Sequence, residues 1–135
     1  MGDITDILLV GHDPHDSDQL LGALEAHGLA RRTKVVRDAD EAVDYLLRAG
    51  SYSATASILL PRLILLDISS LSSPGVVALR KVKANATLRA IPTVVLTRSI
   101  DQATDIELIR AGANSVVARP RAAEKLRDIM GHVVL

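Results

Sequence analysis

Short runs of aliphatic residues, each followed by turn residues, divide the chain into regular segments. The run Leu63–Leu66 has no polar break, so it predicts a strand that is buried on both faces of a sheet. Similar runs predict four more strands, which are expected at residues 7–10, 33–37, 91–97 and 114–118. The basic flanks of the second of these, Lys34 and Arg37, indicate a place nearer the edge of the sheet.

Between the strands, apolar residues recur at the spacing of a helix. Asp16 or Ser17 is expected to cap the first helix and Asp101 to cap the fourth. The first helix is expected to end at Gly28, and the second is expected to run from Asp38 or Asp40 to Gly50. The other three are expected from Val76 to residues 84–87, from 102 to 111 and from 122 to 130. The residues of the second helix expected to face the core are Ala42, Val43, Leu46 and Leu47. This alternation predicts one α/β domain over residues 1–135, with a parallel sheet covered by helices on both faces.

A carboxylate follows the most apolar of the predicted strands. Asp67 comes directly after Leu63–Leu66 and precedes a serine-rich turn that ends in Pro74 and Gly75. In open parallel sheets, ligand and reaction sites lie outside the carboxyl ends of the strands, so Asp67 is a candidate site residue. The alternative is that Asp67 only caps a turn or helix, since aspartate is common in turns after strands.

The composition excludes several classes of function. Lysine and arginine together number 16 and aspartate and glutamate 16, so bulk charge does not favour binding to nucleic acid or to a membrane surface. Cysteine, phenylalanine and tryptophan are absent, which excludes disulfides, thiol nucleophiles and an aromatic platform for stacking bases. No apolar run approaches the roughly 20 residues of a membrane span, so a soluble cytoplasmic protein is expected.

Several segments, in their order and spacing, resemble a response-regulator receiver domain over essentially the whole chain. The closest likeness is to the single-domain receivers that partner phytochromes and related histidine kinases. The matching segments are residues 7–10 with Asp13-Pro14, residues 36–42, residues 63–67, residues 91–97, and residues 111–114 leading to Arg119-Pro120. The resemblance implies a flavodoxin-like sheet of five parallel strands in the order 2-1-3-4-5, with five helices.

The resemblance also implies a chemistry, the transfer of a phosphoryl group from a kinase histidine to an aspartate. By position, Asp67 matches the phosphoacceptor and Thr97 matches the hydroxyl that binds a phosphoryl oxygen. Arg119 stands where the family has a lysine that pairs with the phosphate. Gly11 and His12 stand where the family has the pair of acidic residues that holds Mg²⁺.

These two positions depart sharply from the family pattern. Mg²⁺ prefers oxygen ligands, whereas Gly11 offers no side chain and His12 offers a nitrogen that suits softer metals. Asp13 and Asp67 are the possible residual ligands, so binding of Mg²⁺ is expected to be weak or lost, and no other cofactor is indicated. The planar fork of Arg119 is suited to a bidentate contact with a carboxylate, and our hypothesis is that Arg119, with or without His12, fills the space of the metal and holds Asp67 in a fixed ion pair.

Three other positions leave alternatives open. Val116 matches an aromatic switch residue of the family and is interpreted as a plain core valine. The segment from His12 to Asp18 is dense in histidine and aspartate, so it is either a transition-metal site or a solvated loop with helix caps. Asp13-Pro14-His15 begins like a cobalamin-binding motif, but Asp18 stands where that motif needs glycine.

Two functions are therefore weighed. The first is a stand-alone phosphorelay receiver with an atypical acceptor site at Asp67, Thr97 and Arg119. The second is a pseudo-receiver that acts as a protein-interaction module without phosphorylation. In either case no enzyme is expected, and the partner is a histidine kinase or another signalling protein. Contacts are expected through residues 111–123 and the apolar tail 133–135, and the tail either packs on the domain or forms a homodimer contact.

Overall fold

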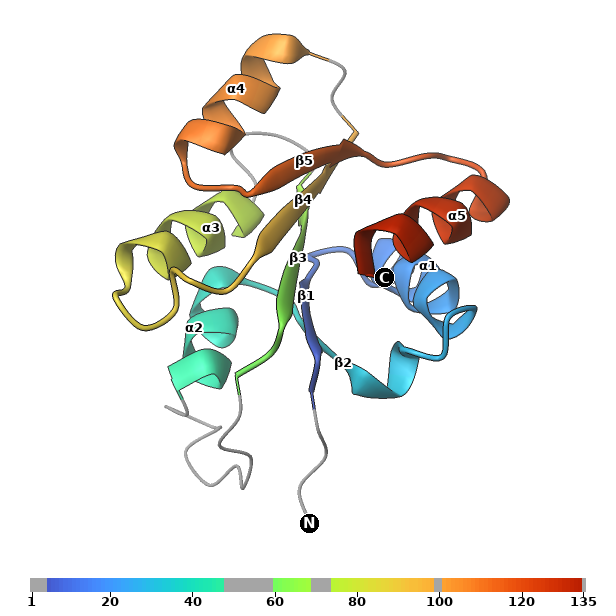
Figure 1. The fold of residues 1–135 in the computed structure, drawn as a ribbon, viewed down its shortest axis with the longest axis horizontal. Coiled ribbons are helices and arrows are strands. Elements are labelled where there is room, and N and C mark those ends of the chain that lie inside the picture. Colours follow the sequence, from blue (N-terminus) through green and yellow to red (C-terminus); the bar gives the residue numbers. More distant parts are fainter. Residues whose placement is uncertain (1–4, 48–59, 69–73, 99–100, 135) are drawn as a thin grey trace.

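Five parallel strands form a single sheet in the order β2-β1-β3-β4-β5, as predicted (Figure 1). The computed structural model describes residues 5–47, 60–68, 74–98 and 101–134. The predicted loop 51–57 and the serines at 69–73 lie outside this part. The strands are β1 (Ile7–Val10), β2 (Thr33–Val36), β3 (Leu63–Ile68), β4 (Thr93–Thr97) and β5 (Ser115–Ala118).

Helices cover both faces of the sheet. Figure 1 shows α1 and α5 side by side over one face, with α2 and α3 over the other and α4 beside the edge strand β5. No helix in the described residues is long and apolar enough to cross a membrane. The helices are α1 (Pro14–Glu25), α2 (Ala39–Leu47), α3 (Pro74–Ala84), α4 (Gln102–Arg110) and α5 (Ala123–Val134), and a short 3₁₀ helix, η1 (Ala30–Arg32), precedes β2.

The central strands are apolar without interruption because alternate side chains enter two separate cores. In β3, Ile64 and Leu66 pack on the side of α2 and α3, whereas Leu65 packs with α1 and α5. All four residues of β1 are buried. The edge strands β2 and β5 are only partly buried. The side of Leu65 matters for function, because Asp67 is the next residue of β3 on that same face.

The first helix begins earlier than predicted. Asp13, not Asp16 or Ser17, is the N-cap of α1, and its carboxylate accepts hydrogen bonds from the backbone N–H groups of His15 (2.8 Å) and Asp16 (3.2 Å). Pro14 fits the first helical position because its fixed φ suits the helix and its missing N–H is not needed there. Ser17 is therefore a residue of the helix, and it is buried against the sheet. The predicted cap at Asp101 of α4 is confirmed, with Ala103 N–H donating over 3.1 Å.

Two predictions about apolar residues are wrong. Leu47, expected to face the core, is 45% exposed, and Tyr45 is buried in α2 instead, with its hydroxyl donating to Thr5 Oγ1 over 2.6 Å. The tail expected after residue 130 is the last turn of α5, and Val133 packs partly against the α1–α5 core. At Val133 the structure thus agrees with the alternative in which the tail packs on the domain, while Leu135 lies outside the described residues.

Candidate functional site

The candidate site lies at the carboxyl edge of the sheet, on the side covered by α1 and α5. Asp67, the penultimate residue of β3, is in register with Leu96 of β4. Its side chain is only 10% exposed. Asp67 is thus a nearly buried carboxylate at the end of an apolar strand.

Arg119 is the partner of Asp67, as the sequence predicts. It follows β5, where its backbone N–H donates to the Thr97 carbonyl over 2.8 Å. Its side chain is only 3% exposed, and Nη1 donates to Asp67 Oδ2 over 2.8 Å. The expected ion pair is present but the contact is through one nitrogen, because Nη2 turns to α1 and donates to the Asp16 carbonyl (3.0 Å) and to Gln19 Oε1 (3.1 Å). The guanidinium thus joins β3 to α1 rather than clamping one carboxylate.

Burial sets the protonation behaviour of Asp67. Loss of solvent around the carboxyl raises its pKa above the ordinary value, and the nearby Arg119 guanidinium opposes that shift without reversing it. The ionised form of Asp67 is thus costly in this environment, and Arg119 is the principal group that offsets the cost. Removing either side chain would therefore leave the charge of the other buried and uncompensated.

A second ion pair closes the site toward solvent. Arg98, directly after β4, places Nη2 2.6 Å from Asp16 Oδ1, with side chains that are 48% and 18% exposed. The hydrogen bond from Arg98 lowers the pKa of the Asp16 carboxyl, and the same bond raises the pKa of Arg98. Asp67 and Asp16 thus face Arg119 and Arg98. Sequence reasoning did not assign Asp16, Gln19 or Arg98 to the site; the available signal was the spacing of Asp16 and Gln19 on one helical face.

The residues after β1 form the other half of this edge. Gly11 is buried, and a Cβ added there would collide with the Ser17 hydroxyl. That hydroxyl is buried and has no hydrogen-bond partner within the described structure. His12 is exposed and makes no hydrogen bond or ion pair with Asp67 in the described part of the chain, so the predicted help of His12 in holding Asp67 is wrong. The Asp13 carboxylate accepts the hydrogen bonds that cap α1.

Two other family positions are in place. Thr97, the last residue of β4, is 2% exposed and lies in register with Ile68 and Ala118. Val116 in β5 is partly buried and packs against the core on the side of α2, α3 and α4. A valine packed in this way agrees with its interpretation as a plain core residue.

Several known proteins are similar to this chain in sequence or in fold, although no protein-family model matches it. The probable methanogenesis regulatory protein FilR2 of Methanothrix harundinacea is 35% identical over 90% of this chain and 76% of its own length. The solved bacteriophytochrome response regulator AtBRR is 34% identical, with a TM-score of 0.75, over 95% of this chain and 91% of that one. The phosphorylated cyanobacterial phytochrome response regulator RcpA is 29% identical, with a TM-score of 0.81, over 96% and 91%.

This chain belongs to the response-regulator receiver domains. The receiver is therefore a component of two-component phosphorelay signalling, and it has the five-stranded flavodoxin-like fold of its structural relatives. Receivers are signalling proteins that interact with histidine kinases and other signalling proteins.

The residues at the expected magnesium site of this receiver do not fit the ion. Mg²⁺ needs oxygen ligands, usually one or two carboxylates with water. Here Gly11 has no donor, Asp13 caps α1, and one oxygen of Asp67 is occupied by Arg119. Nowhere in the described ranges do three or more histidine, aspartate or glutamate residues gather as a metal site. The dense segment from His12 to Asp18 is accordingly the capped start of α1.

Proposed function

We propose that this receiver transmits its signal through protein contacts while Asp67 stays in a permanent ion pair, without magnesium-dependent phosphoryl transfer. The observation that carries the proposal is the buried contact of 2.8 Å between Arg119 Nη1 and Asp67 Oδ2. In this proposal the guanidinium takes over the charge balance that a metal ion supplies in an ordinary receiver. The proposal treats residues 1–135 as one domain.

Phosphoryl transfer to a carboxylate places two anionic groups in contact, so positive charge must lie where the phosphoryl oxygens develop. Arg119 is positive, but it is held in place by three hydrogen bonds, to Asp67, to the Asp16 carbonyl and to Gln19. Admitting a phosphoryl group at Oδ2 would require at least the bond to Asp67 to break. Because Arg119 is buried, that rearrangement would leave its charge without a partner and without solvent, which is energetically costly.

The charge balance of the site supports the same conclusion. Two carboxylates, Asp67 and Asp16, face two guanidinium groups, Arg119 and Arg98, so the formal charges of the four side chains cancel. An ordinary receiver site without metal has an excess of acid that attracts a divalent cation. A neutral group of paired residues lacks that attraction, which supports a receiver that does not depend on Mg²⁺.

A second candidate function is phosphorylation of Asp67 in a slower, atypical manner. It is favoured by the presence of both Asp67 and a buried Thr97 at the family positions. The related RcpA was solved in a phosphorylated form. In this alternative, Arg98 and Arg119 would supply the positive charge after breaking their present ion pairs.

We place the protein contact on α4 and the adjacent strand β5. Ile106 and Ile109 of α4 are 45% and 48% exposed, and β5 is a partly exposed edge strand. The two isoleucines are three residues apart on one helix and so lie on the same face, where they form a small apolar surface for a partner. The partner is a histidine kinase, another signalling protein or a second copy of this receiver, and binding to nucleic acid or membrane is not part of the proposal.

Intact mass spectrometry separates the two candidates. The receiver is incubated with acetyl phosphate and Mg²⁺, with the Asp67→Asn variant in parallel. The proposal expects no phosphoryl adduct on either protein. Gain of one phosphoryl group that is absent from Asp67→Asn would reject the proposal in favour of the second candidate. A known phosphorylatable receiver in the same incubation shows that the donor is active.

A further inference from the structure

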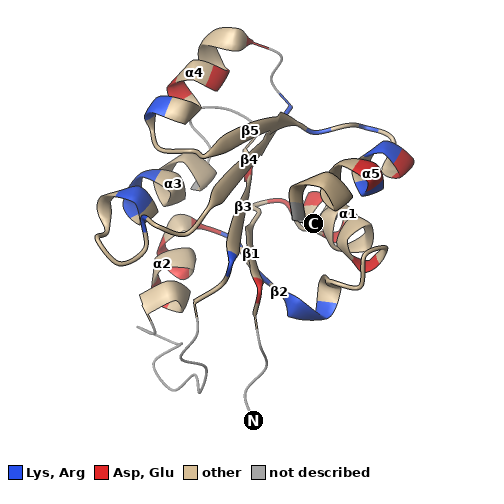
Figure 2. Cartoon of the chain, in the orientation of Figure 1, with Lys and Arg blue, Asp and Glu red and all other residues tan. Residues whose placement is uncertain are grey.

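A polar cavity lies directly outside the Asp67–Arg119 pair. Its volume is about 390 Å³, which is near the lower end of the range for small-molecule sites. It is formed by the start of α1, the residue after β4 and the connection from β5 to α5, and Figure 2 shows basic residues along that connection. The charged and polar side chains that line it are His15, Asp16, Gln19, Arg98, Arg119 and Arg121.

The lining carries an excess of positive charge. Three arginines face a single carboxylate, that of Asp16, and this carboxylate is already paired with Arg98. Arg119 is paired with Asp67 behind the cavity wall. Arg121 is exposed and has no hydrogen bond or ion pair with any residue that the structure describes. Asp67 lies behind the cavity wall and the Asp13 carboxylate also acts on Arg98, so Arg121 is the guanidinium in the lining that stays available to an anion.

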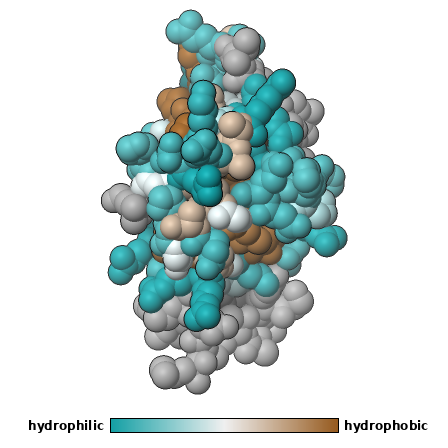
Figure 3. Space-filling view, turned by 90° about the vertical axis from the view of Figure 1, so that its right-hand side faces the viewer, coloured by the Kyte–Doolittle hydropathy of each residue, from teal (hydrophilic) through white to brown (hydrophobic). Residues whose placement is uncertain are grey.

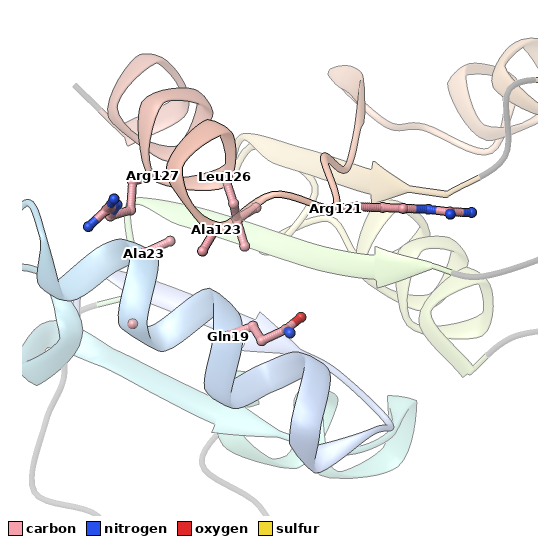
Figure 4. Close-up of a pocket in the computed structure, with 7 residues that line it drawn as sticks. Gln19, Ala23, Arg121, Ala123, Leu126 and Arg127 are labelled. Atoms are coloured by element: carbon pink, nitrogen blue, oxygen red, sulfur yellow. The ribbon is translucent and has the colours of Figure 1, made fainter.

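The guanidinium groups lie at different depths. Arg119 is buried at the base, whereas the side chain of Arg98 is 48% exposed. Figure 4 shows the Arg121 side chain extending along the direction of the strands, away from Arg127 on α5, and the Gln19 amide extending the same way from α1. Arg121 therefore points past the neighbouring groove between α1 and α5, toward the carboxyl edge where the cavity lies.

The surrounding surface indicates a polar ligand. The face over α1 and α5 is mainly hydrophilic, with small and separate hydrophobic areas (Figure 3). Guanidinium groups bind phosphate oxygens in pairs of parallel hydrogen bonds, and they keep their charge at any physiological pH. A phosphate dianion would meet Arg98 and Arg121 at the mouth of the cavity, and the remaining volume would hold a small organic group.

We propose that this cavity binds a small phosphate monoester reversibly, with Arg98 and Arg121 as the residues that contact the phosphate. The inference goes beyond the proposed function, because binding requires neither Mg²⁺ nor a covalent bond to Asp67. The site would let the receiver respond to a phosphorylated small molecule through the Arg98–Asp16 ion pair and the contacts by which Arg119 links β3 to α1.

The test is isothermal titration calorimetry of the full chain with phenyl phosphate and, separately, with inorganic phosphate, in buffer containing a chelator. We expect saturable binding of phenyl phosphate that is tighter than binding of inorganic phosphate. Arg121→Gln should weaken binding about tenfold, the value of one lost charged hydrogen bond. The matched control is Arg127→Gln, which removes a guanidinium from α5 outside the cavity and should leave binding unchanged.

Absence of saturable binding would overturn the proposal, as would equal weakening by Arg121→Gln and Arg127→Gln, which indicates only general charge attraction. Equal affinity for phenyl phosphate and inorganic phosphate would reject the monoester as the ligand class. Circular dichroism of each variant confirms that the fold is retained. A phosphoryl adduct in the mass experiment contradicts the proposed function but leaves this binding test unaffected, so the two failures are distinguishable.

Discussion

The two halves of the carboxyl edge of the sheet differ in what they preserve of a receiver site. The half formed by β3, β4 and β5 has Asp67, Thr97 and Arg119 at the family positions, two of them joined in a buried ion pair. The half formed by β1 and the start of α1 has Gly11 packed against Ser17 and an aspartate that caps the helix. One half therefore keeps the acceptor position, and the other has lost the groups that would bring a metal ion to it.

This difference shows how a receiver fold stays intact without its metal. An isolated buried carboxylate at Asp67 would be costly, because ionised groups lose favourable hydration on burial. Arg119 compensates for that cost from β5, and α1 provides acceptors for the remaining N–H groups of the same guanidinium.

The largest effect is expected from Arg119→Met, which removes the cation and leaves Asp67 buried without its partner. Breaking a buried ion pair from one side typically costs about 3 to 5 kcal/mol of unfolding free energy. The double variant Asp67→Leu with Arg119→Met removes both charges and should recover most of that loss. Urea denaturation at pH 7 measures all three proteins.

An exposed ion pair is the control for this experiment. Lys81 Nζ lies 2.8 Å from Asp40 Oδ1, and the side chains are 48% and 84% exposed. Lys81→Met should therefore leave the free energy of unfolding nearly unchanged, because solvent screens an exposed ion pair. Equal losses from Arg119→Met and Lys81→Met would show that the Asp67–Arg119 pair has no special weight in this receiver.

An intermediate effect is expected from Gly11→Ala in the half that follows β1. The new Cβ meets the Ser17 hydroxyl, and overpacking of this kind typically costs about 1 to 3 kcal/mol. Adding Ser17→Ala removes the clashing oxygen and should restore stability. Gly22→Ala in α1 is the matched control, because its Cβ meets nothing within 4 Å and should stabilise the helix by about 0.5 to 1 kcal/mol. Thermal unfolding compares the variants, and an unchanged melting temperature in Gly11→Ala would contradict the packing argument.

The smallest effect concerns the ion pair of Asp16 with Arg98. Since the pKa of Asp16 is lowered in the folded protein, the pair stabilises the fold above the ordinary value of 3.8, and this contribution is lost as the pH falls through the folded pKa. Asp16→Asn should thus cost no more than about 1 kcal/mol at pH 7, because Arg98 is half exposed. The difference from the original protein should shrink on acidification, as measured by denaturation at several pH values. Asp18→Asn, which removes a carboxylate from an exposed position of the same helix, is the matched charge control at pH 7 and should cost less than Asp16→Asn.

The sequence predicts much of this architecture because strand ends converge by topology. Once the order of the parallel strands is known, residues after β3 and β5 come to the same edge, so the pairing of Asp67 with Arg119 could be predicted. The five strands and the cap at Asp101 were likewise accessible, since an unbroken apolar run and a capping residue are local signals.

The contacts of α1 could not be predicted in the same way. The expected cap at Asp16 or Ser17 would leave Asp16 before the first turn of the helix, whereas the cap at Asp13 makes both Asp16 and Gln19 helical residues. The split of the guanidinium between Asp67 and α1 depends on this earlier start, because the Asp16 carbonyl and the Gln19 side chain accept from Arg119 Nη2. The expected role of His12 failed for a related reason, because the turn before Asp13 leaves its side chain exposed.

The central claim is that Arg119 replaces the metal at Asp67, and a titration with Mg²⁺ monitored by NMR tests it most directly. The backbone amides of Asp67 and of residues 11–13 are followed in isotope-labelled protein through the millimolar range of Mg²⁺. The account predicts no saturable shift at these amides in the original protein or in Asp67→Asn. A saturable shift at Asp67 that disappears in Asp67→Asn would contradict the claim, since it would show that the carboxylate is available to the ion despite Arg119.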